Sequence, residues 1–205
     1  VEQIVSVGEE HKLCPYELGM LLAAKSQVIV TDYYYLFHPQ IRETFFKKNG
    51  KSLEDAIIII DEGHNLPYRI KDLASVSLST TFLKRAATES KKFNFPNMVS
   101  IFEKLTLALE SILPEDVQEE HITMDKFMNI VQPIAGYLDL VQECKRLGDI
   151  VREEQKISSV GIVGEFLDSW LGSEEGFTRI ISKKRGTTTD IVTISYRCLD
   201  PSVIF

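Results

Sequence analysis

The spacing of apolar positions changes twice along this chain of 205 residues. Residues 1–75 combine short β-branched runs with helical repeats, which predicts alternating strands and helices. From residue 79 to about residue 172, apolar positions recur every three or four residues, as in amphipathic helices. After Gly176 the period returns to two, which predicts strands. We therefore expect an α/β protein that contains an inserted all-α helical bundle.

Residues 1–78 are expected to build part of a parallel sheet. Helices are predicted at Pro15–Lys25 and Gln40–Lys48, and Asn49-Gly50 is a stop signal for the second. Strands are predicted at Val28–Thr31 and Ala56–Ile60. Four consecutive isoleucines suit a strand covered on both faces, as in the centre of a parallel sheet. The order of these elements indicates a βαβ unit.

The helical part is expected to form a small bundle of four antiparallel helices. One apolar stripe covers residues 98–112, and a second covers residues 127–141 with Pro133 inside it. Proline within a helical repeat predicts a kink or a break. A last helix is predicted over residues 150–171, with Gly172 as its C-cap.

The end of the chain is expected to form a β-hairpin. Residues 177–182 and 187–196 have the period of strands, and the Lys-Lys-Arg-Gly sequence between them suits a turn. Four cations and no acid lie between Arg179 and Arg185. This basic end contrasts with residues 81–172, which hold ten Lys or Arg against fifteen Asp or Glu.

Composition excludes several classes of protein. A 44% hydrophobic and 26% charged chain is neither collagen-like nor disordered. The net charge of −7 argues against a uniformly basic nucleic-acid-binding surface, although a local groove is compatible with it. No apolar run approaches the roughly 20 residues of a membrane-spanning helix, so no membrane partner is expected. Three scattered cysteines do not make a disulfide framework, which predicts an intracellular protein. We interpret the chain as a piece of a longer protein.

The strongest chemical signal is Asp61-Glu62-Gly63-His64, directly after the isoleucine run. Side chains that leave the carboxyl end of a buried strand lie where α/β proteins bind ligands. There, Asp61 can hold Mg²⁺ beside nucleotide phosphates, and Glu62 can deprotonate an attacking water. The plain alternative is an acidic loop that caps the next helix.

Asp61-Glu62-Gly63-His64 resembles the DEAH form of the Walker B motif in superfamily 2 helicases, with Gly63 where alanine is usual. The segment around Cys14-Pro15-Tyr16, followed by the residue 28–36 strand and tyrosines, resembles the xeroderma pigmentosum group D (XPD) family of iron-sulfur DNA helicases. In that family, such a cysteine is the last of four ligands of a [4Fe-4S] cluster. Cys14 alone cannot form that cluster, because the cluster needs four thiolates.

The order of segments also resembles this family, which inserts a helical Arch domain after the Walker B strand. The resemblance implies four parts. They are the end of the iron-sulfur domain (1–15), the Walker B part of helicase domain 1 (16–78), the Arch insertion (79–175) and the return to helicase domain 1 (176–205). The fold class implied is a partial RecA-like parallel sheet with an inserted bundle.

For the parent protein, the resemblance implies ATP- and Mg²⁺-dependent 5′-to-3′ unwinding of DNA in nucleotide excision repair. Asp61 would hold Mg²⁺, Glu62 would be the general base, and His64 would link the nucleotide site to a second motor domain. The chain itself lacks a Walker A loop, since Phe45 stands where the first glycine of a motif ending in Gly50-Lys51-Ser52 would be. We therefore expect the isolated chain not to hydrolyse ATP.

Contacts with single-stranded DNA are predicted at two places. Tyr33, Tyr34 and Tyr35 follow a predicted strand and offer a stacking surface, although packing under a helix is the more ordinary role. The basic hairpin turn offers three cations to phosphate, although a solvated turn is again the plainer interpretation. Those three residues are Lys183, Lys184 and Arg185.

The acidic bundle fits two roles, an arch that encloses a DNA strand or a platform for repair and transcription proteins. Two alternatives to the XPD interpretation stay open. One is a stand-alone helical protein-interaction module, and the other is a helicase of the bacterial damage-inducible (DinG) type, which shares both motifs. The expected compartment is the nucleus for a eukaryotic protein and the cytoplasm for an archaeal one.

Overall fold

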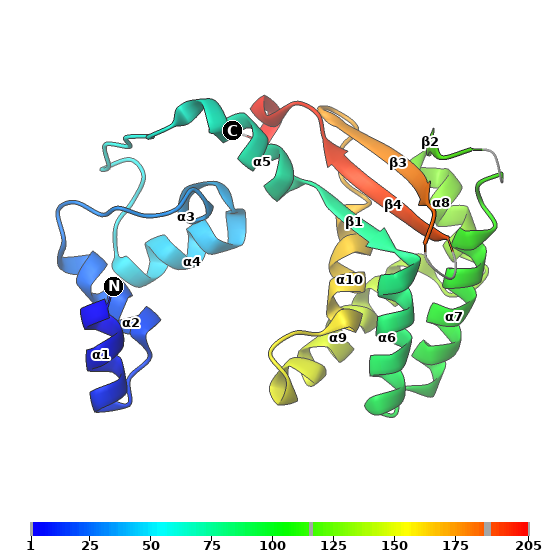
Figure 1. The fold of residues 1–205 in the computed structure, drawn as a ribbon, viewed down its shortest axis with the longest axis horizontal. Helices are drawn as coiled ribbons and strands as arrows, with labels where there is room; N and C mark the ends of the chain where they lie inside the picture. The colour runs from blue at the N-terminus through cyan, green and yellow to red at the C-terminus, as the bar shows by residue number, and fades with distance from the viewer. Residues whose placement is uncertain (1, 115–116, 187–189, 205) are drawn as a thin grey trace. The chain divides into compact units, whose positions relative to one another are not determined.

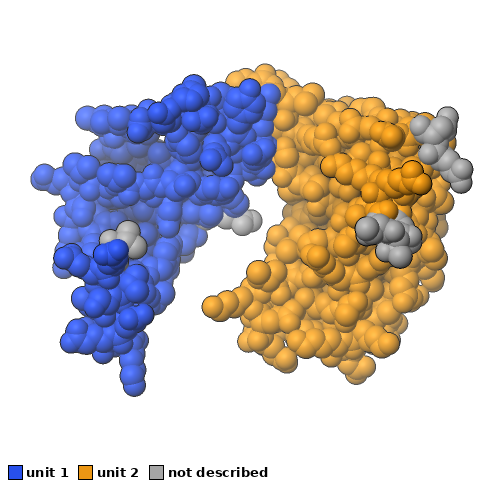
Figure 2. Space-filling model, in the orientation of Figure 1, with its two compact units in different colours: residues 1–73 blue, residues 74–205 orange. Residues whose placement is uncertain are grey.

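The computed structural model describes residues 2–114, 117–186 and 190–204. It divides into two compact units, unit 1 (residues 1–73) and unit 2 (residues 74–205), which Figure 2 colours separately. Helices and a four-stranded sheet make the protein mixed α/β, which confirms the predicted class. Each unit is described by itself below.

Unit 1 is built from short helices, and both predicted helices are present. A left-handed Gly50 with φ of 68° ends α4, as the Asn-Gly signal indicates. Gly50-Lys51-Ser52 is a loop, in agreement with the expectation. The helical elements are α1 (Glu2–His11), α2 (Pro15–Lys25), α3 (Tyr34–Phe37), α4 (Pro39–Asn49), the 3₁₀ turn η1 (Gly63–Asn65) and α5 (Leu66–Ala74), which runs one residue past the boundary.

The two strands predicted in unit 1 do not form. Val28–Thr31 and Ala56–Ile60 lie outside helices and strands, and neither segment pairs with a strand in the described residues. Ile57 and Ile59 are 93% and 89% exposed, whereas Ile58 and Ile60 are 42% and 39% exposed. This alternation keeps the two-residue period of a strand. β-Branched residues favour an extended backbone, but a strand also needs a neighbour to bond to, and these residues lack one here.

Unit 2 contains five helices in its described residues. They are α6 (Thr80–Lys92), α7 (Pro96–Glu110), α8 (Met124–Val131), α9 (Tyr137–Glu154) and α10 (Ser159–Ser169). The break at Pro133 is confirmed, because α8 ends before it and α9 begins after it. The helix predicted over residues 150–171 is wrong, since residues 155–158 separate α9 from α10. Trp170 caps α10, so Gly172 is not its C-cap.

The sheet of unit 2 is antiparallel, not parallel as predicted for the chain. Its order is β1-β4-β3-β2, and every neighbouring pair runs in opposite directions. The strands are β1 (Val76–Ser79), β2 (Glu119–His121), β3 (Phe177–Lys184) and β4 (Ile191–Cys198). The predicted hairpin is thus β3 and β4, although residues 187–189, where its second strand was predicted to begin, lie outside the described residues.

β1 is the first strand of unit 2 along the chain, and it pairs with β4, the last. Val76 stands opposite Tyr196, and the Cys198 backbone N–H donates to the Ser75 hydroxyl at 3.0 Å. The hairpin therefore belongs to the same compact unit as the helices. A 3₁₀ turn, η2 (Pro201–Ile204), follows β4.

The core of unit 2 lies between the sheet and its helices. Leu78, Ile194 and Ile181 oppose one another across β1, β4 and β3, and each is at most 1% exposed. Helices α6, α7 and α10 contact these strands, and Figure 1 shows them beside the sheet. Burial of these apolar side chains stabilises the layered arrangement. Within the described residues, no helix is long and apolar enough to cross a bilayer.

Candidate functional site

Asp61 and Glu62 lie in a tight turn between the isoleucine run and η1. Glu62 adopts a left-handed conformation with φ of 51°, which is uncommon for a residue with a side chain. Its carbonyl accepts a hydrogen bond from the Asn65 N–H at 2.9 Å, which closes the turn. A left-handed non-glycine residue is a strained position, and such positions concentrate at functional sites.

The acidic and basic groups of this turn contact one another and face solvent. The Asp61 carboxylate accepts a hydrogen bond from the Glu62 N–H at 2.9 Å. The Glu62 carboxylate lies 3.2 Å from His64 Nδ1, and these side chains are 66% and 73% exposed. Two adjacent carboxylates suit Mg²⁺, which is usually held by one or two carboxylates together with substrate phosphates. The two carboxylates are therefore of a type that would hold Mg²⁺, and a nucleotide site here stays a prediction.

Tyr33 joins this turn to the segment that follows Val28–Thr31. Its hydroxyl donates to the Asp61 carbonyl oxygen and lies 3.4 Å from that of Glu62. A hydrogen bond thus links residues that follow the two β-branched runs, although these runs do not pair as strands. This anchoring role of Tyr33 was missed from the sequence, because a tyrosine pattern does not specify the partner of a hydroxyl.

The three tyrosines do not form one stacking surface. Tyr35 packs edge-on against Phe45, with ring centroids 5.1 Å apart. The Tyr33 hydroxyl is hydrogen-bonded to the Asp61 carbonyl, and the side chain is half-buried. Tyr34 is 42% exposed and is the most accessible of the three. Stacking on a base therefore stays a prediction for Tyr34 above all.

Cys14 is exposed at the N-cap of α2. In the described part of the chain, no group of three or more His, Cys, Asp or Glu is arranged to hold a metal ion. Cys144 and Cys198 are buried in unit 2. A [4Fe-4S] cluster takes four thiolates, so the cysteines present here do not fit one by themselves.

The basic hairpin is divided between the surface and the core. Lys183 donates from Nζ to the Pro114 carbonyl at 3.0 Å, whereas Lys184 and Arg185 are exposed. Arg179 is only 3% exposed and donates to the carbonyls of Trp170 and Gly172, at 2.9 and 2.6 Å from Nη2. Its role in holding the end of α10 could not be recognised from a run of cations. Contact with phosphate stays a prediction for the three residues of the turn.

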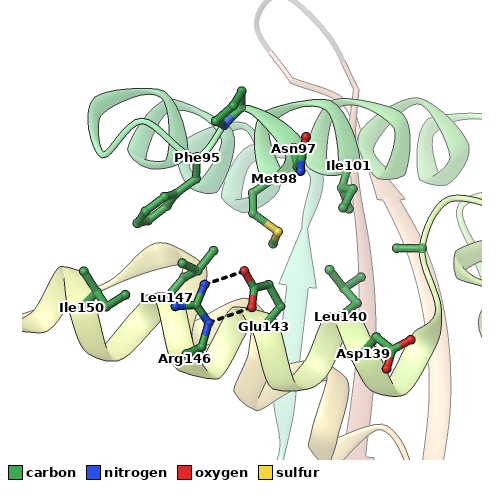
Figure 3. A pocket seen from close by; sticks show the side chains of 12 residues that line it. Phe95, Asn97, Met98, Ile101, Asp139, Leu140, Glu143, Arg146, Leu147 and Ile150 are labelled. Carbon is green, nitrogen blue, oxygen red and sulfur yellow. Dashed lines mark hydrogen bonds and ion pairs between the residues drawn. The ribbon is translucent and has the colours of Figure 1, made fainter.

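A separate apolar pocket of about 400 Å³ lies between α7 and α9. Figure 3 shows Met98 above Leu147, with Phe95 and Ile150 at one end. On α9, Arg146 donates two hydrogen bonds to the Glu143 carboxylate, at 2.8 and 2.7 Å. The sequence-predicted catalytic residues do not line this pocket, because all of them belong to unit 1.

Comparison with known proteins finds a matching family model over part of the chain and similarity to helicases. Residues 1–83 match DEAD_2. A regulator of telomere elongation helicase 1 homolog from Anopheles gambiae is 34% identical over 90 residues, which are 44% of this chain and 9% of that protein. The ATP-dependent DNA helicase DDX11 of Homo sapiens is 34% identical over 89 residues, 43% of this chain and 9% of that protein. The chain is thus similar to these two helicases over less than half of its length.

A third similar protein matches a longer stretch. The general transcription and DNA repair factor IIH helicase subunit XPD/RAD3 of Saccharomyces cerevisiae is 26% identical over 167 residues, 67% of this chain and 21% of that protein. That share is more than residues 1–83 can supply, so the similarity continues into unit 2. The chain spans from 9% to 21% of the length of these three relatives.

Proposed function

We propose that this chain is part of an ATP-dependent 5′-to-3′ DNA helicase of the XPD family that acts in nucleotide excision repair. The observation that carries the proposal is the strained turn that presents Asp61 and Glu62 after the isoleucine run, within the stretch that matches DEAD_2. The longer similarity to XPD/RAD3 supports the XPD branch over the DinG type.

The residues of the turn would divide the chemistry. Asp61 would hold Mg²⁺, which when bound neutralises charge on the nucleotide phosphates. Glu62 would orient the attacking water and accept its proton. His64, in contact with Glu62, would link the nucleotide site to a second motor domain. ATP and Mg²⁺ are thus the proposed cofactors.

The exposed isoleucines support a site completed by other parts of the parent protein. Ile57–Ile60 alternate in exposure like a strand, yet the described residues provide no neighbour. We propose that these residues join the sheet of helicase domain 1 in the whole protein, with Val28–Thr31 beside them. Cys14 would likewise be one ligand of a [4Fe-4S] cluster whose other ligands lie outside this chain. The isolated chain is then inactive as an ATPase.

The proposed organisation keeps the four parts in order along the chain. Residues 1–15 end the iron-sulfur domain, residues 16–78 carry the Walker B part, and residues 79–175 form the Arch insertion. Of residues 176–205, β3 and β4 complete the sheet of unit 2, and the residues after Cys198 lead back to helicase domain 1. Single-stranded DNA and repair or transcription proteins are the proposed partners, in the nucleus or in an archaeal cytoplasm.

The first test uses the whole parent protein with Glu62→Gln. The substitution keeps the size of the side chain but removes the base, so DNA-stimulated ATP hydrolysis should fall about 100-fold or more. Nucleotide binding, measured by calorimetry, should persist. Glu54→Gln is the matched control, since Glu54 is an exposed acid of the same unit outside the turn. Full activity in Glu62→Gln would refute the assignment of the base.

The rival function is a protein-interaction module, and the apolar pocket between α7 and α9 is the observation that favours it. Asp139 at its edge suits a partner segment that presents an apolar side chain next to a cation. Mg-ATP binding separates the two functions. If the parent protein shows no affinity for Mg-ATP while unit 2 binds such a segment tightly, the module is the better description.

A further inference from the structure

Helix α6 has an exposed surface whose charges are all positive. Its four cations, Lys84, Arg85, Lys91 and Lys92, are exposed, whereas its one carboxylate, Glu89, is 8% exposed. The following residues 93–172 hold six Lys or Arg against fourteen Asp or Glu. Within residues 80–172, α6 is therefore a local basic strip beside an acidic remainder.

Part of this strip forms a groove of about 450 Å³. Helical spacing of three and four residues places its α6 members on one face. The lining residues, which we call the α6 groove, are Thr81, Lys84, Arg85, Thr88, Glu89 and Lys92, with Gln155 after α9. Ammonium and guanidinium groups form a set of hydrogen-bond donors for an anion, whereas the Thr88 hydroxyl donates to the Lys84 carbonyl at 2.9 Å.

The cations of the α6 groove are positioned by weak contacts and can still bind an anion. Lys84 contacts Glu110 at 2.8 Å, and Lys92 donates to the Gln155 side-chain oxygen at 3.1 Å. Arg85 forms no ion pair with the residues that the structure describes. An exposed ion pair such as Lys84–Glu110 contributes at most about 1 kcal/mol, so an incoming phosphate can replace it.

The buried Glu89 repels an incoming anion less than a solvent-exposed carboxylate would. Its oxygens accept hydrogen bonds from the Ser158 hydroxyl at 2.8 Å and from the backbone N–H groups of Ser159 and Val160 at 3.0 and 2.8 Å. These groups begin α10, whose dipole offsets the negative charge. Gln155 Nε2 also donates to Glu89, at 2.7 Å, which fixes the amide that contacts Lys92.

We propose that the α6 groove binds the phosphodiester backbone of single-stranded DNA. Lys84 and Arg85 lie about two helical turns from Lys92, or roughly 10 Å along the axis, so the cations repeat along a line. A line of cations suits a chain of phosphates and does not select a base. The assignment of DNA as the ligand rests on the proposed helicase function. The groove would be the point where the helical insertion contacts the DNA strand.

The test measures binding of fluorescein-labelled oligo(dT) to the 205-residue chain by anisotropy at several salt concentrations. Arg85→Gln combined with Lys92→Gln should weaken binding about tenfold at low salt. The slope of log K against log salt should fall by about 1.4, since each lost contact with a single strand contributes about 0.7. Fluorescence of Trp170, a residue fully buried in unit 2, checks that the variant folds.

The matched control is Lys104→Gln combined with Lys126→Gln, which removes two exposed cations outside the groove. Its affinity should change less than about twofold. Equal losses in both double variants would mean that only net charge matters, and unchanged binding in the groove variant would also overturn the proposal. Equally strong competition by polyglutamate would replace a nucleic-acid site with a general anion site.

The DNA-binding test of the groove can fail independently of the ATP-hydrolysis test of the proposed function. If Glu62→Gln abolishes ATP hydrolysis in the parent protein but the groove variant binds DNA normally, only the groove assignment fails. If the groove variant loses DNA binding but Glu62→Gln remains active, only the assignment of the motor site fails.

Discussion

Two side chains of the unit 2 core hold their protons more firmly than they would in water. Burial raises the pKa of the Cys144 thiol to about 12. Burial also raises the pKa of Tyr137, although the positive charge of Arg179 opposes this effect. The Tyr137 hydroxyl donates to the Leu167 carbonyl at 2.8 Å, which places a neutral phenol between α9 and α10. The folded state therefore favours the protonated forms.

We predict that unit 2 loses stability above about pH 8.5, where an unfolded cysteine begins to ionise. The folded state then binds more protons than the unfolded state, so the free energy of unfolding falls as pH rises. Cys144 should contribute a loss of about 2 kcal/mol between pH 7.5 and pH 10. Urea unfolding followed by Trp170 fluorescence at pH 7.5 and pH 10 measures the change.

Cys144→Ala should reduce this pH dependence, even if the variant is less stable at neutral pH. Cys14→Ala is the control, because Cys14 is exposed. A pH dependence that is the same in Cys144→Ala as in the original chain would contradict the assignment to this thiol.

At the scale of elements, α9 and α10 approach closely at glycines. A Cβ atom on Gly148 would lie 2.5 Å from the Gly161 Cα, which is backbone and cannot move aside. A Cβ atom on Gly164 would lie 2.8 Å from the Cys144 Cβ. The close crossing of the two helices therefore depends on the absence of side chains at these positions.

We predict that Gly148→Ala destabilises unit 2 by about 1–3 kcal/mol, although alanine favours a helix over glycine by about 1 kcal/mol. The matched control is Gly19→Ala in α2, where a Cβ atom would meet nothing within 4 Å. That variant should gain up to about 1 kcal/mol in unit 1. Thermal unfolding followed by circular dichroism measures both, and a stabilised Gly148→Ala would show that the crossing can relax.

Elements with local start and stop signals could be predicted from the sequence, and those set by distant contacts could not. Pro96, Gly50 and Pro133 mark ends of helices through their own backbone preferences. The start of α10 has a local N-cap in Ser158, whose hydroxyl accepts from the Gly161 N–H, but it also depends on Glu89, which caps α10 from 69 to 71 residues away. Likewise, the isoleucine run shows the period of a strand but not whether a neighbour is present.

The candidate site divides in the same way. The adjacency of Asp61, Glu62 and His64 is a property of the sequence, so their grouping could be predicted, whereas their catalytic roles stay predictions. The hydrogen bond from Tyr33 to Asp61 joins residues 28 apart, and the groove on α6 depends on the inward turn of Glu89. Neither feature has a sequence pattern of its own.

At the scale of the whole molecule, the two units differ in how much apolar surface they bury. The main core cluster runs from Leu78 to Tyr196 and lies wholly in unit 2. Among the residues of unit 1 whose burial is described, the buried apolar ones are Met20, Ala23, Phe45 and Ile70, and the isoleucine run is exposed. Since burial of apolar surface is the main stabilising contribution, unit 2 should be the more stable unit.

We predict two unfolding transitions in urea, with unit 1 unfolding first. Trp170 is the single tryptophan of the chain, so its fluorescence reports on unit 2, while far-ultraviolet circular dichroism reports on helices of both units. The dichroism curve should begin to change at lower urea than the fluorescence curve. Coincident curves would instead mean that the two units unfold as one cooperative body.

The pairing of β1 with β4 also governs how unit 2 is attached to the polypeptide. Val76 and Tyr196 face each other across one ladder, so the entry and exit points lie roughly 5 Å apart. The residues between them can therefore vary in length or be replaced by another domain, while the flanking backbone keeps the same two attachment points. Excision of residues 77–195 and closure by a short linker would leave the rest of the polypeptide a junction of almost unchanged span.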